Sequence, residues 1–389
     1  MLACDGRSLF GARGPHMRRA HGNERILTLD AARGTAMLLA CLAHFAWWME
    51  AAYPSLALKL ATIGLVATPA FMVLSGSMIG LKAGRARLVG TKMRLDLIDR
   101  GIFLIIVAHV LIAVAEVHRG GTILQRLEQF NSVDEIGVGC ILFGVFNGLA
   151  LKPMRVLLTL VFSLTCLGWA LALAWHPLMP TAMVVEELLV GQLTNNPIVD
   201  YACPMAPYLA LFVAGVVLGR FVAQREQQGR LDSIATPLCK LGATMVAAAL
   251  AAQLSYKWAA MQGWVSADSA WHASVGILRK IPPSPGYLVF FTGVALMMFG
   301  LLTHLRRATR ARWLLEWLAT IGQVSLFVFV LQYFVFWTLP DLLGLKPASY
   351  FPLLFAGQIA LLWFMARWWG RIGGNRWIRI GLRSQQPVG

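Results

Sequence analysis

About ten apolar runs, each close to the length of a membrane-spanning helix, divide this chain and limit what it can fold into. A helix needs about 20 apolar residues to cross roughly 30 Å of hydrocarbon. The pattern therefore predicts an all-α polytopic integral membrane protein, a bundle of about ten transmembrane helices. The runs lie near residues 31–50, 58–81, 100–117, 134–151, 155–175, 206–224, 236–256, 286–305, 314–338 and 349–370.

The charge of the chain supports a membrane location. Only 13% of the residues are charged, against about 25% in soluble proteins. The net charge of +16 is large enough to suggest nucleic-acid binding. However, Lys and Arg fall in short clusters between the apolar runs, as they do in cytoplasmic loops. The expected partner is therefore the lipid bilayer, and nucleic acid is not expected.

The basic clusters fall on alternate loops, which predicts the orientation of the chain. They lie at residues 82–94, 152–155, 220–230, 306–312 and 371–383. By the positive-inside rule these loops and both termini lie in the cytoplasm. The opposite loops are poorer in Lys and Arg and too short to form a domain with its own core. Any chemistry is therefore expected inside the bundle or at its outer mouth.

The two ends of the chain differ from the bundle in composition. Residues 1–24 are polar and basic and lack the apolar core of a signal peptide, so we expect a flexible cytoplasmic tail. The bundle is expected over 25–371, and a second basic cytoplasmic tail over 372–389. None of the six cysteines has a metal-binding spacing, and no metal site is expected.

The first run, "RILTLDAARGTAMLLACLAH", carries three polar residues on one helical stripe. Asp30, Arg33 and His44 point within roughly 60° of one another on a helix. Asp30 and Arg33 suit capping and ion pairing at a helix start. His44 lies about 21 Å further along the axis, past the membrane midplane. An ionisable group at that depth usually faces a cavity or a partner, and its near-neutral pKa suits a general base. A hydrogen-bonded structural histidine is the alternative.

Two further features have both a packing and a binding interpretation. In the second run, Ser75 and Gly76 allow close helix approach or an unwound segment. In the ninth run, the amide of Gln332 is expected to bridge helices or to line a cavity. Asp134 and Glu135 open the fourth run.

The loop after the second run is strongly basic. Its cations suit the phosphates of a nucleotide such as coenzyme A, or the headgroups of anionic lipids. The loop and the start of the third run contain Lys82, Arg85, Arg87, Lys92, Arg94 and Arg100.

Several segments, in this order, resemble the transmembrane acyltransferase superfamily (acyltransferase 3-like). The opening stretch resembles its R-x-x-x-LD-x-x-RG…H motif, and "FMVLSG" resembles its F-x-x-SG motif. "VDEIGVG" and "KIPPS" are most similar to the heparan-α-glucosaminide N-acetyltransferase branch, whose bacterial members often have D-x-L-x-x-IG and K-x-PPS. The resemblance covers most of residues 25–340.

This resemblance implies transfer of an acyl group, usually acetyl, from cytoplasmic acyl-CoA to a hydroxyl or amine of a glycan or glycoside on the exported side. It also implies a bacterial inner membrane. We assign catalytic roles to His44, Asp30 and Arg33, acyl-CoA binding to Arg85, Arg94, Arg100, Ser75 and Gly76, and acceptor binding to Glu50, Asp200, Lys280, Ser284 and Gln332.

The sequence departs from the family at one important position. Gln332 stands where the family usually has a histidine; if that histidine shares in proton transfer or acceptor binding, the change would redirect or remove activity. A transporter or flippase of a small solute or glycolipid, without acyl chemistry, is the alternative function, although the chain has no inverted repeat. A non-catalytic scaffold is a third. The acceptor, the acyl chain, O- versus N-transfer and the oligomeric state, a homo-oligomer included, stay open.

Overall fold

The computed structural model describes residues 26–86, 91–117, 121–146, 148–175, 179–191, 203–266, 269–346 and 350–381. Within these ranges every named element is a helix, and the one extended pairing is an isolated bridge between Lys280 and Pro283. Eight helical segments are long and apolar enough to cross a membrane. The all-α polytopic fold class is therefore confirmed.

Each predicted run corresponds to a helix or to consecutive helices. They are α1 (Leu27–Met49), α2 (Pro54–Gly64) with α3 (Ala67–Ala86), α4 (Thr91–Phe103) with α5 (His109–Glu116), α7 (Ser132–Val145), α8 (Met154–Ala174), α10 (Met205–Gln227), α11 (Ala235–Met261), α13 (Pro285–Leu305), α14 (Arg312–Gln323) with α15 (Ser325–Tyr333), and α17 (Phe351–Arg371). Four short helices lie between them: α6 (Ile123–Leu127), α9 (Pro180–Leu189), α12 (Ala270–Val275) and α16 (Leu339–Leu342).

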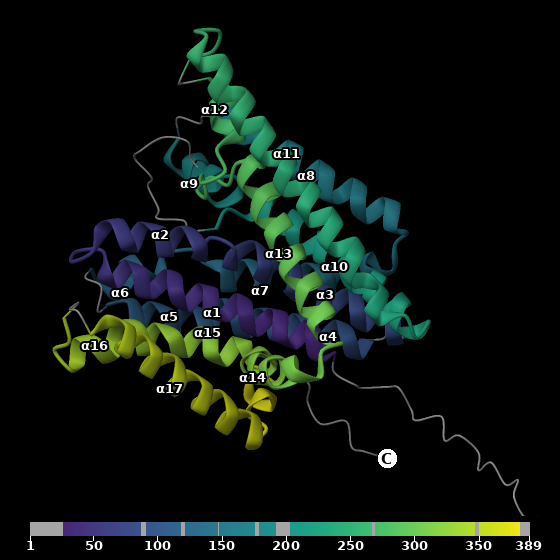
Figure 1. Cartoon of the computed structure of the whole chain (residues 1–389), viewed down its shortest axis with the longest axis vertical. Helices are drawn as coiled ribbons and strands as arrows, with labels where there is room; N and C mark the ends of the chain where they lie inside the picture. The colour runs from purple at the N-terminus through teal and green to yellow at the C-terminus, as the bar shows by residue number, and fades with distance from the viewer. Residues whose placement is uncertain are drawn as a thin grey trace, which may run out of the picture.

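The basic loops meet at one end of the bundle. Arg85, at the end of α3, forms an ion pair with Glu226 at the end of α10. Arg220 of α10 donates to the carbonyl of Lys152, just before α8. We call this the basic end. The opposite end, which carries α6, α9, α12 and α16, is the loop end; Figure 1 shows α6 and α16 at the left of the bundle and α4 at the right.

Helices α3 and α10 run parallel and touch backbone to backbone along a glycine seam. A Cβ added to Gly76 would fall on the Phe212 carbonyl oxygen, and one added to Gly80 would fall on the Val216 carbonyl oxygen. The partner helix presents glycines at the same four-residue spacing, Gly215 and Gly219, whose Cβ atoms would likewise meet α3 backbone. Paired small-xxx-small faces are the usual way in which membrane helices approach closely.

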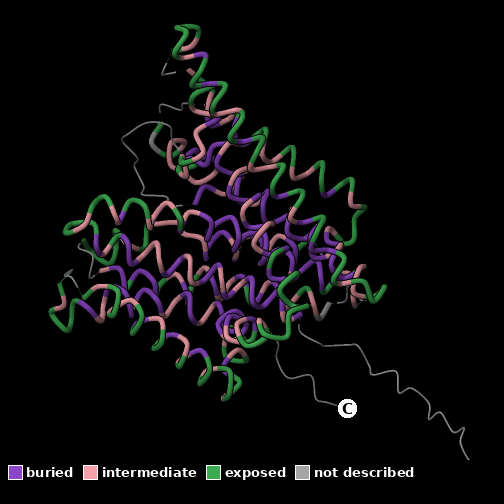
Figure 2. The backbone as a smooth tube through the Cα atoms, in the orientation of Figure 1, coloured by how far each residue is buried: buried purple, intermediate pink, exposed green. Residues whose placement is uncertain are grey.

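Helices α1, α3 and α10 form the centre of the bundle, and α8, α11 and α17 lie around it (Figure 2). In the 18-residue apolar stretch of α10, 61% is buried inside the protein, whereas in that of α17 only 17% is buried. The outward faces of the peripheral helices are rich in large apolar side chains, such as Phe162 and Leu353. Since lipid tails solvate such side chains, these faces are suited to contact with the bilayer.

Two of the predicted runs are broken rather than continuous. The second run breaks at Leu65, whose carbonyl accepts a hydrogen bond of 3.1 Å from the Tyr287 hydroxyl. The ninth run, expected as one span over 314–338, divides at Val324. Helix α14 buries Leu318 on one face and exposes Arg312 on the other, so it is amphipathic. Figure 1 views α14 nearly end-on, so it lies across the direction of α1 and α15.

Two π-helical segments interrupt helices in the loop-end half of the bundle. The first, η1 (Leu104–Ala108), directly precedes His109, and the second, η6 (Phe334–Thr338), contains Trp337. Helix α5 packs against η6, and the Thr338 hydroxyl lies 3.5 Å from the Ala115 carbonyl. Single-turn π segments often occur at functional sites, because the extra residue redirects the side chains that follow.

Candidate functional site

Helices α1 and α15 run in the same direction, and their contact contains most of the polar groups of the predicted site. Arg33 Nη2 donates to Ser325 Oγ at 2.6 Å, near the basic end. Further along, the Cys41 thiol donates to Gln332 Oε1 at 3.2 Å. Arg33 and His44 of the predicted stripe both face α15. Their partners on that helix, Ser325 and Tyr333, follow one another in the same order along the chain. We call this contact the polar seam.

His44 lies in an aromatic box near the loop end of the polar seam. Its ring centroid is 4.8 Å from that of Tyr333, 5.1 Å from that of Trp337 and 5.4 Å from that of Trp47. The imidazole is half-buried, and Trp47 is exposed. A histidine with aromatic walls and one open side can take a proton from a bound hydroxyl or amine while the walls limit access of water.

Gln332 directly precedes Tyr333 of the box and contacts Cys41, which lies about one helical turn before His44 on α1. Gln332 is fully buried, and its Oε1 accepts the Cys41 thiol. Its Nε2 has no hydrogen-bond partner among the described residues. A buried amide donor without an acceptor carries a free-energy cost of about 1–3 kcal/mol. The position therefore offers a donor for an oxygen of a bound substrate.

Asp30 and Arg33 occupy the basic end of the seam. Arg33 Nη1 lies 3.8 Å from Asp30 Oδ1, and Asp30 is only 4% exposed. The first turn of α1 also packs tightly against α14, because a Cβ on Gly322 would fall on the Asp30 carbonyl oxygen. The pair thus connects α1 to the junction between α14 and α15. Arg33 is about 17 Å from His44 along α1.

The three arginines predicted to bind the coenzyme have different surroundings. Arg85 is held in a two-point ion pair with Glu226, with Nε 2.6 Å from Oε2. Arg94 is exposed on α4. Arg100, also on α4, lies close enough to Lys82 of α3 for their charges to interact.

Lys82 joins a set of cations from three helices. It interacts electrostatically with Arg100 and with Arg33 of α1, and Asp96 is the acid near it. We call Arg33, Lys82 and Arg100 the basic cluster. Like charges held together destabilise one another unless an anion neutralises them. Asp30 beside Arg33 and Asp96 near Lys82 offset part of this positive charge. Lys82 and Arg85 belong to the same basic stretch of the sequence. The sequence alone does not show that Arg85 is paired with Glu226 whereas Lys82 lies near other cations.

The remaining predicted residues have other places in the structure. Gly76 is used in the glycine seam, and Ser75 beside it is half-buried. Glu50 is exposed at the end of α1. The Lys280 carbonyl accepts from the Tyr208 hydroxyl at 3.3 Å. Asp200 lies outside the described residues.

Ser284 has a clear local role as the N-cap of α13. Its hydroxyl oxygen accepts from the Tyr287 N–H at 2.9 Å and its proton is donated to the Gly276 carbonyl at 2.7 Å. A serine at this position satisfies a backbone N–H that the helix leaves unpaired. The side chain is fully buried. These bonds account for the serine of the "KIPPS" segment without a ligand.

An ion pair that the sequence analysis missed lies between α5 and α7. His109 Nδ1 is 2.8 and 2.9 Å from the two oxygens of Asp134, and Nε2 is 3.1 Å from the Leu127 carbonyl of α6. Both ring nitrogens donate at once only in the positively charged ring. The signal was present, since a histidine inside an apolar run is itself unusual.

Glu135 follows Asp134 and is fully buried. Neither of its carboxyl oxygens has a hydrogen-bond partner among the described residues. Nearby, at the loop-end start of α10, burial raises the pKa of the Cys203 thiol to about 11, and its sulfur lies 3.3 Å from the Ser132 hydroxyl. This region is therefore dry, and the Cys203 thiol holds its proton more firmly than it would in water.

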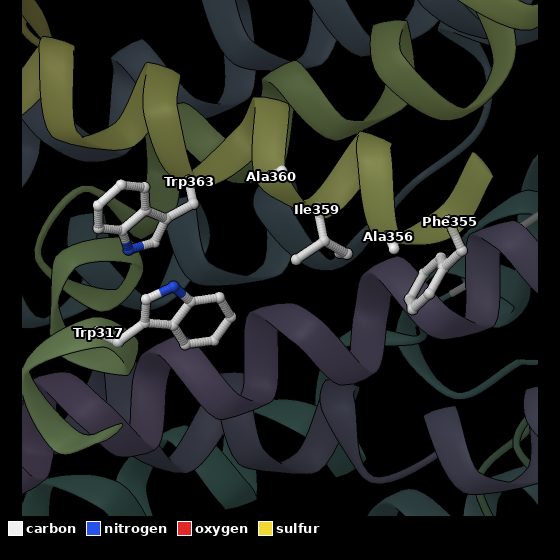
Figure 3. A pocket seen from close by; sticks show the side chains of 6 residues that line it. All are labelled: Trp317, Phe355, Ala356, Ile359, Ala360 and Trp363. Atoms are coloured by element: carbon white, nitrogen blue, oxygen red, sulfur yellow. The ribbon is translucent and has the colours of Figure 1, made fainter. Parts of the chain in front are cut away.

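An apolar cavity of about 430 Å³ lies between α14 and α17. Trp317, Phe355, Ala356, Ile359, Ala360 and Trp363 line it. Figure 3 shows the two indole rings at one end and Phe355 at the other. No residue of the predicted site lines it, and its walls offer little to a charged or sugar-like ligand.

A family model described as heparan-alpha-glucosaminide N-acetyltransferase, catalytic, matches residues 25–243. The match contains α1 with His44 and all three members of the basic cluster. It ends within α11, so α15 with Gln332 lies beyond it. No curated protein matches the chain.

Proposed function

Because the chain belongs to the heparan-α-glucosaminide N-acetyltransferase catalytic family, we propose that it is an acyl-CoA-dependent membrane acyltransferase. The donor is acetyl-CoA or a related acyl-CoA from the cytoplasm, and the acceptor is a hydroxyl or amine of a glycan or glycoside on the exported side. The observation that carries the proposal is the layout of α1. This helix has a cation of the basic cluster at one end and a half-buried histidine about 17 Å away.

The distribution of charge supports this orientation. The basic end gathers the Lys- and Arg-rich loops, which the positive-inside rule assigns to the cytoplasm. Phosphates of the donor would bind Lys82, Arg100 and Arg33 there, since guanidinium and ammonium groups form charge-assisted hydrogen bonds with phosphate. The pantetheine arm would then extend along the polar seam toward the aromatic box. The acceptor would approach His44 from the loop end.

In the proposed reaction His44 acts as a general base. Its neutral imidazole takes the proton of the acceptor O–H or N–H as the acceptor oxygen or nitrogen bonds to the thioester carbonyl carbon. The C–S bond then breaks, and the departing thiolate takes that proton back from the imidazolium. The products are the acylated acceptor and free coenzyme A.

Gln332 is suited to a supporting role in the same step. As the acceptor adds, the carbonyl oxygen gains negative charge, and a fixed N–H donor stabilises that charge. The Nε2 of Gln332 is such a donor, held by the bond from Cys41 to its Oε1. An uncharged amide in this position supplies a hydrogen bond but no second base.

The test replaces His44 by alanine in the purified full-length protein. Release of free coenzyme A thiol from acetyl-CoA, with a panel of glycoside acceptors, is expected to fall by about 10²- to 10⁴-fold. His304→Ala, at the exposed basic end of α13, is the matched control. Full activity of the His44 variant, or wild-type uptake of solute into vesicles without thiol release, would contradict the proposal.

A further inference from the structure

The apolar cavity between α14 and α17 opens on the outer side of the bundle. Helix α17 is peripheral, with only 17% of its apolar stretch buried, and Ala356 and Ala360 of the cavity wall are exposed. In a membrane this side of the bundle meets hydrocarbon. The volume of about 430 Å³ falls within the range of small-ligand pockets, about 300–1,000 Å³. We call this cavity the side groove.

The wall of the side groove changes from apolar to polar along α17. Phe355 and Ile359 present hydrocarbon alone, whereas Trp363, about 12 Å beyond Phe355 along the helix, adds an indole N–H. Trp317 of α14 lies opposite, and Figure 3 shows the nitrogen of each indole on the edge that faces the other ring. Trp363 Nε1 is buried and has no hydrogen-bond partner among the described residues. One end of the groove therefore offers a donor to an oxygen atom of a ligand.

An arginine lies beyond the indole end of the side groove. Arg367 follows Trp363 by one helical turn, and its guanidinium carbon is 5.4 Å from the centroid of that ring. Arg367 is exposed, and α17 contains no acidic residue. On the facing helix, Glu316 is paired with Arg312 at 2.8 Å. The indole end therefore has a positive charge beside it at the surface.

The indole end of the side groove is directed toward the basic end of the bundle. Helix α17 ends at Arg371, and Ile380 beyond it donates to Asp99 of α4. Tryptophan is enriched at the depth where hydrocarbon meets the lipid headgroups. A basic pocket between membrane helices on the cytoplasmic side suits an acidic headgroup. The groove thus matches an amphipathic molecule whose polar end lies at the basic end of the bundle.

A second membrane helix suits the side groove less well than a lipid chain does. Ala356 and Ala360 form a small-xxx-small pair of the kind through which membrane helices associate. However, the backbone carbonyls of a packed helix are bonded within that helix, so Trp363 Nε1 would still lack an acceptor. The ester oxygens of a lipid supply an acceptor, and an acidic phosphate group suits Arg367.

We propose that the side groove binds one acyl chain of an acidic phospholipid from the cytoplasmic leaflet, with an ester oxygen at the Trp363 indole and the headgroup at Arg367. The lipid joins the amphipathic α14 to α17. This site lies outside residues 25–243 of the family match and does not depend on the proposed acyl transfer.

The first test fills the side groove. Ala360→Phe places a ring in it, so the purified full-length variant is expected to retain one phosphatidylglycerol fewer than wild type, counted by native mass spectrometry in detergent. Ala170→Phe, exposed on the peripheral helix α8, is the matched control and should retain the wild-type number. Equal retention by wild type and Ala360→Phe overturns the inference. A wild-type dimer that Ala360→Phe converts to monomers also overturns it, because a second copy then occupies the groove.

The second test measures the headgroup preference of the site that Ala360→Phe removes. Wild type is expected to bind phosphatidylglycerol about fivefold more tightly than phosphatidylcholine with the same chains, since one arginine faces the acidic headgroup. Arg367→Gln should lose this preference, whereas Arg155→Gln, exposed on α8, should keep it. Trp363→Phe keeps an aromatic ring without the N–H and should weaken both lipids about fivefold.

Size-exclusion chromatography in detergent shows whether each variant is folded. A preference that persists in Arg367→Gln overturns the placement of the headgroup, and unchanged affinity in Trp363→Phe overturns the placement of the ester oxygen.

Discussion

Two pairs of parallel helices in this bundle pack in opposite ways. Helices α3 and α10 meet through glycines, with backbone against backbone and no room for a side chain. Helices α1 and α15 meet through Arg33, Cys41 and His44, whose side chains face hydroxyl, amide and aromatic groups. A glycine seam can adopt only one geometry, so it suits a frame. A polar seam is held by hydrogen bonds that a substrate can replace, so it suits a site.

The largest effect is expected from filling the glycine seam. Gly80→Leu would place side-chain atoms on the Val216 carbonyl, so α3 and α10 must separate. Overpacking of a tight contact, with the side-chain and backbone shifts that it forces, costs about 1–3 kcal/mol and occasionally more. We expect loss of most folded protein, measured by size-exclusion chromatography in detergent. Gly357→Leu on α17, where a Cβ meets nothing within 4 Å, is the control and is expected to fold normally.

A smaller but still large effect is expected at the basic end of the polar seam. Arg33→Leu removes the cation beside the buried Asp30 and the bond to Ser325. Breaking a buried ion pair costs about 3–5 kcal/mol, whereas Ser325→Ala, which loses one hydrogen bond to a charged group, should cost about 1.5–3 kcal/mol. Denaturant unfolding of both single variants and the double variant measures the coupling. Equal losses in the two single variants would show that Asp30 does not depend on Arg33.

A third expectation concerns catalysis rather than folding. Gln332→Leu keeps the side-chain volume but removes the amide donor proposed for the carbonyl oxygen. We expect kcat to fall about 10²-fold, as for loss of one oxyanion donor, with the unfolding midpoint changed by only a few degrees. Steady-state kinetics and thermal unfolding on the same preparation measure both. Gln358→Leu on α17, which loses a buried hydrogen bond to the Val335 carbonyl of η6, is the control for burial alone.

Gln332→His, which places the usual family residue here, sharpens the comparison further. An ionisable ring beside the aromatic box should add a new ionisation to the pH profile of kcat. A profile unchanged in both variants would mean that Gln332 takes no part in the reaction.

Much of this architecture could be predicted from hydropathy, because crossing a bilayer imposes the length and apolarity of each run. The break at Val324 could not, because α14 is apolar on one face and its neighbours decide whether it crosses or lies flat. Arg33 and His44 were predictable from helical phase. His109 is visible in the sequence as a histidine inside an apolar run, but its pairing with Asp134, 25 residues away, could not be predicted. Pairings of this kind depend on tertiary packing, which spacing along one helix does not show.

The smallest effect is expected at the loop-end start of α10, within the frame. Burial raises the pKa of Cys203 from 9.0 to about 11. Between these values the native thiol keeps a proton that the unfolded chain loses, so the folded state binds more protons and stability falls as pH rises. The stabilisation is complete below pH 9 and is lost toward pH 11. From pH 8 to 9.5, Cys203→Ala should therefore lose slightly less stability than wild type, by up to about 1 kcal/mol.

Tryptophan fluorescence during thermal unfolding at each pH measures that difference, with Cys166→Ala on the exposed face of α8 as the control. Cys203 is buried whereas Cys166 is exposed, so the difference should be specific to Cys203. If Cys203→Ala and Cys166→Ala follow the same pH dependence, water reaches the start of α10. The packing around α3 and α10 would then admit water at the loop end. The difference between the glycine seam and the polar seam would hold only in the middle of the bundle.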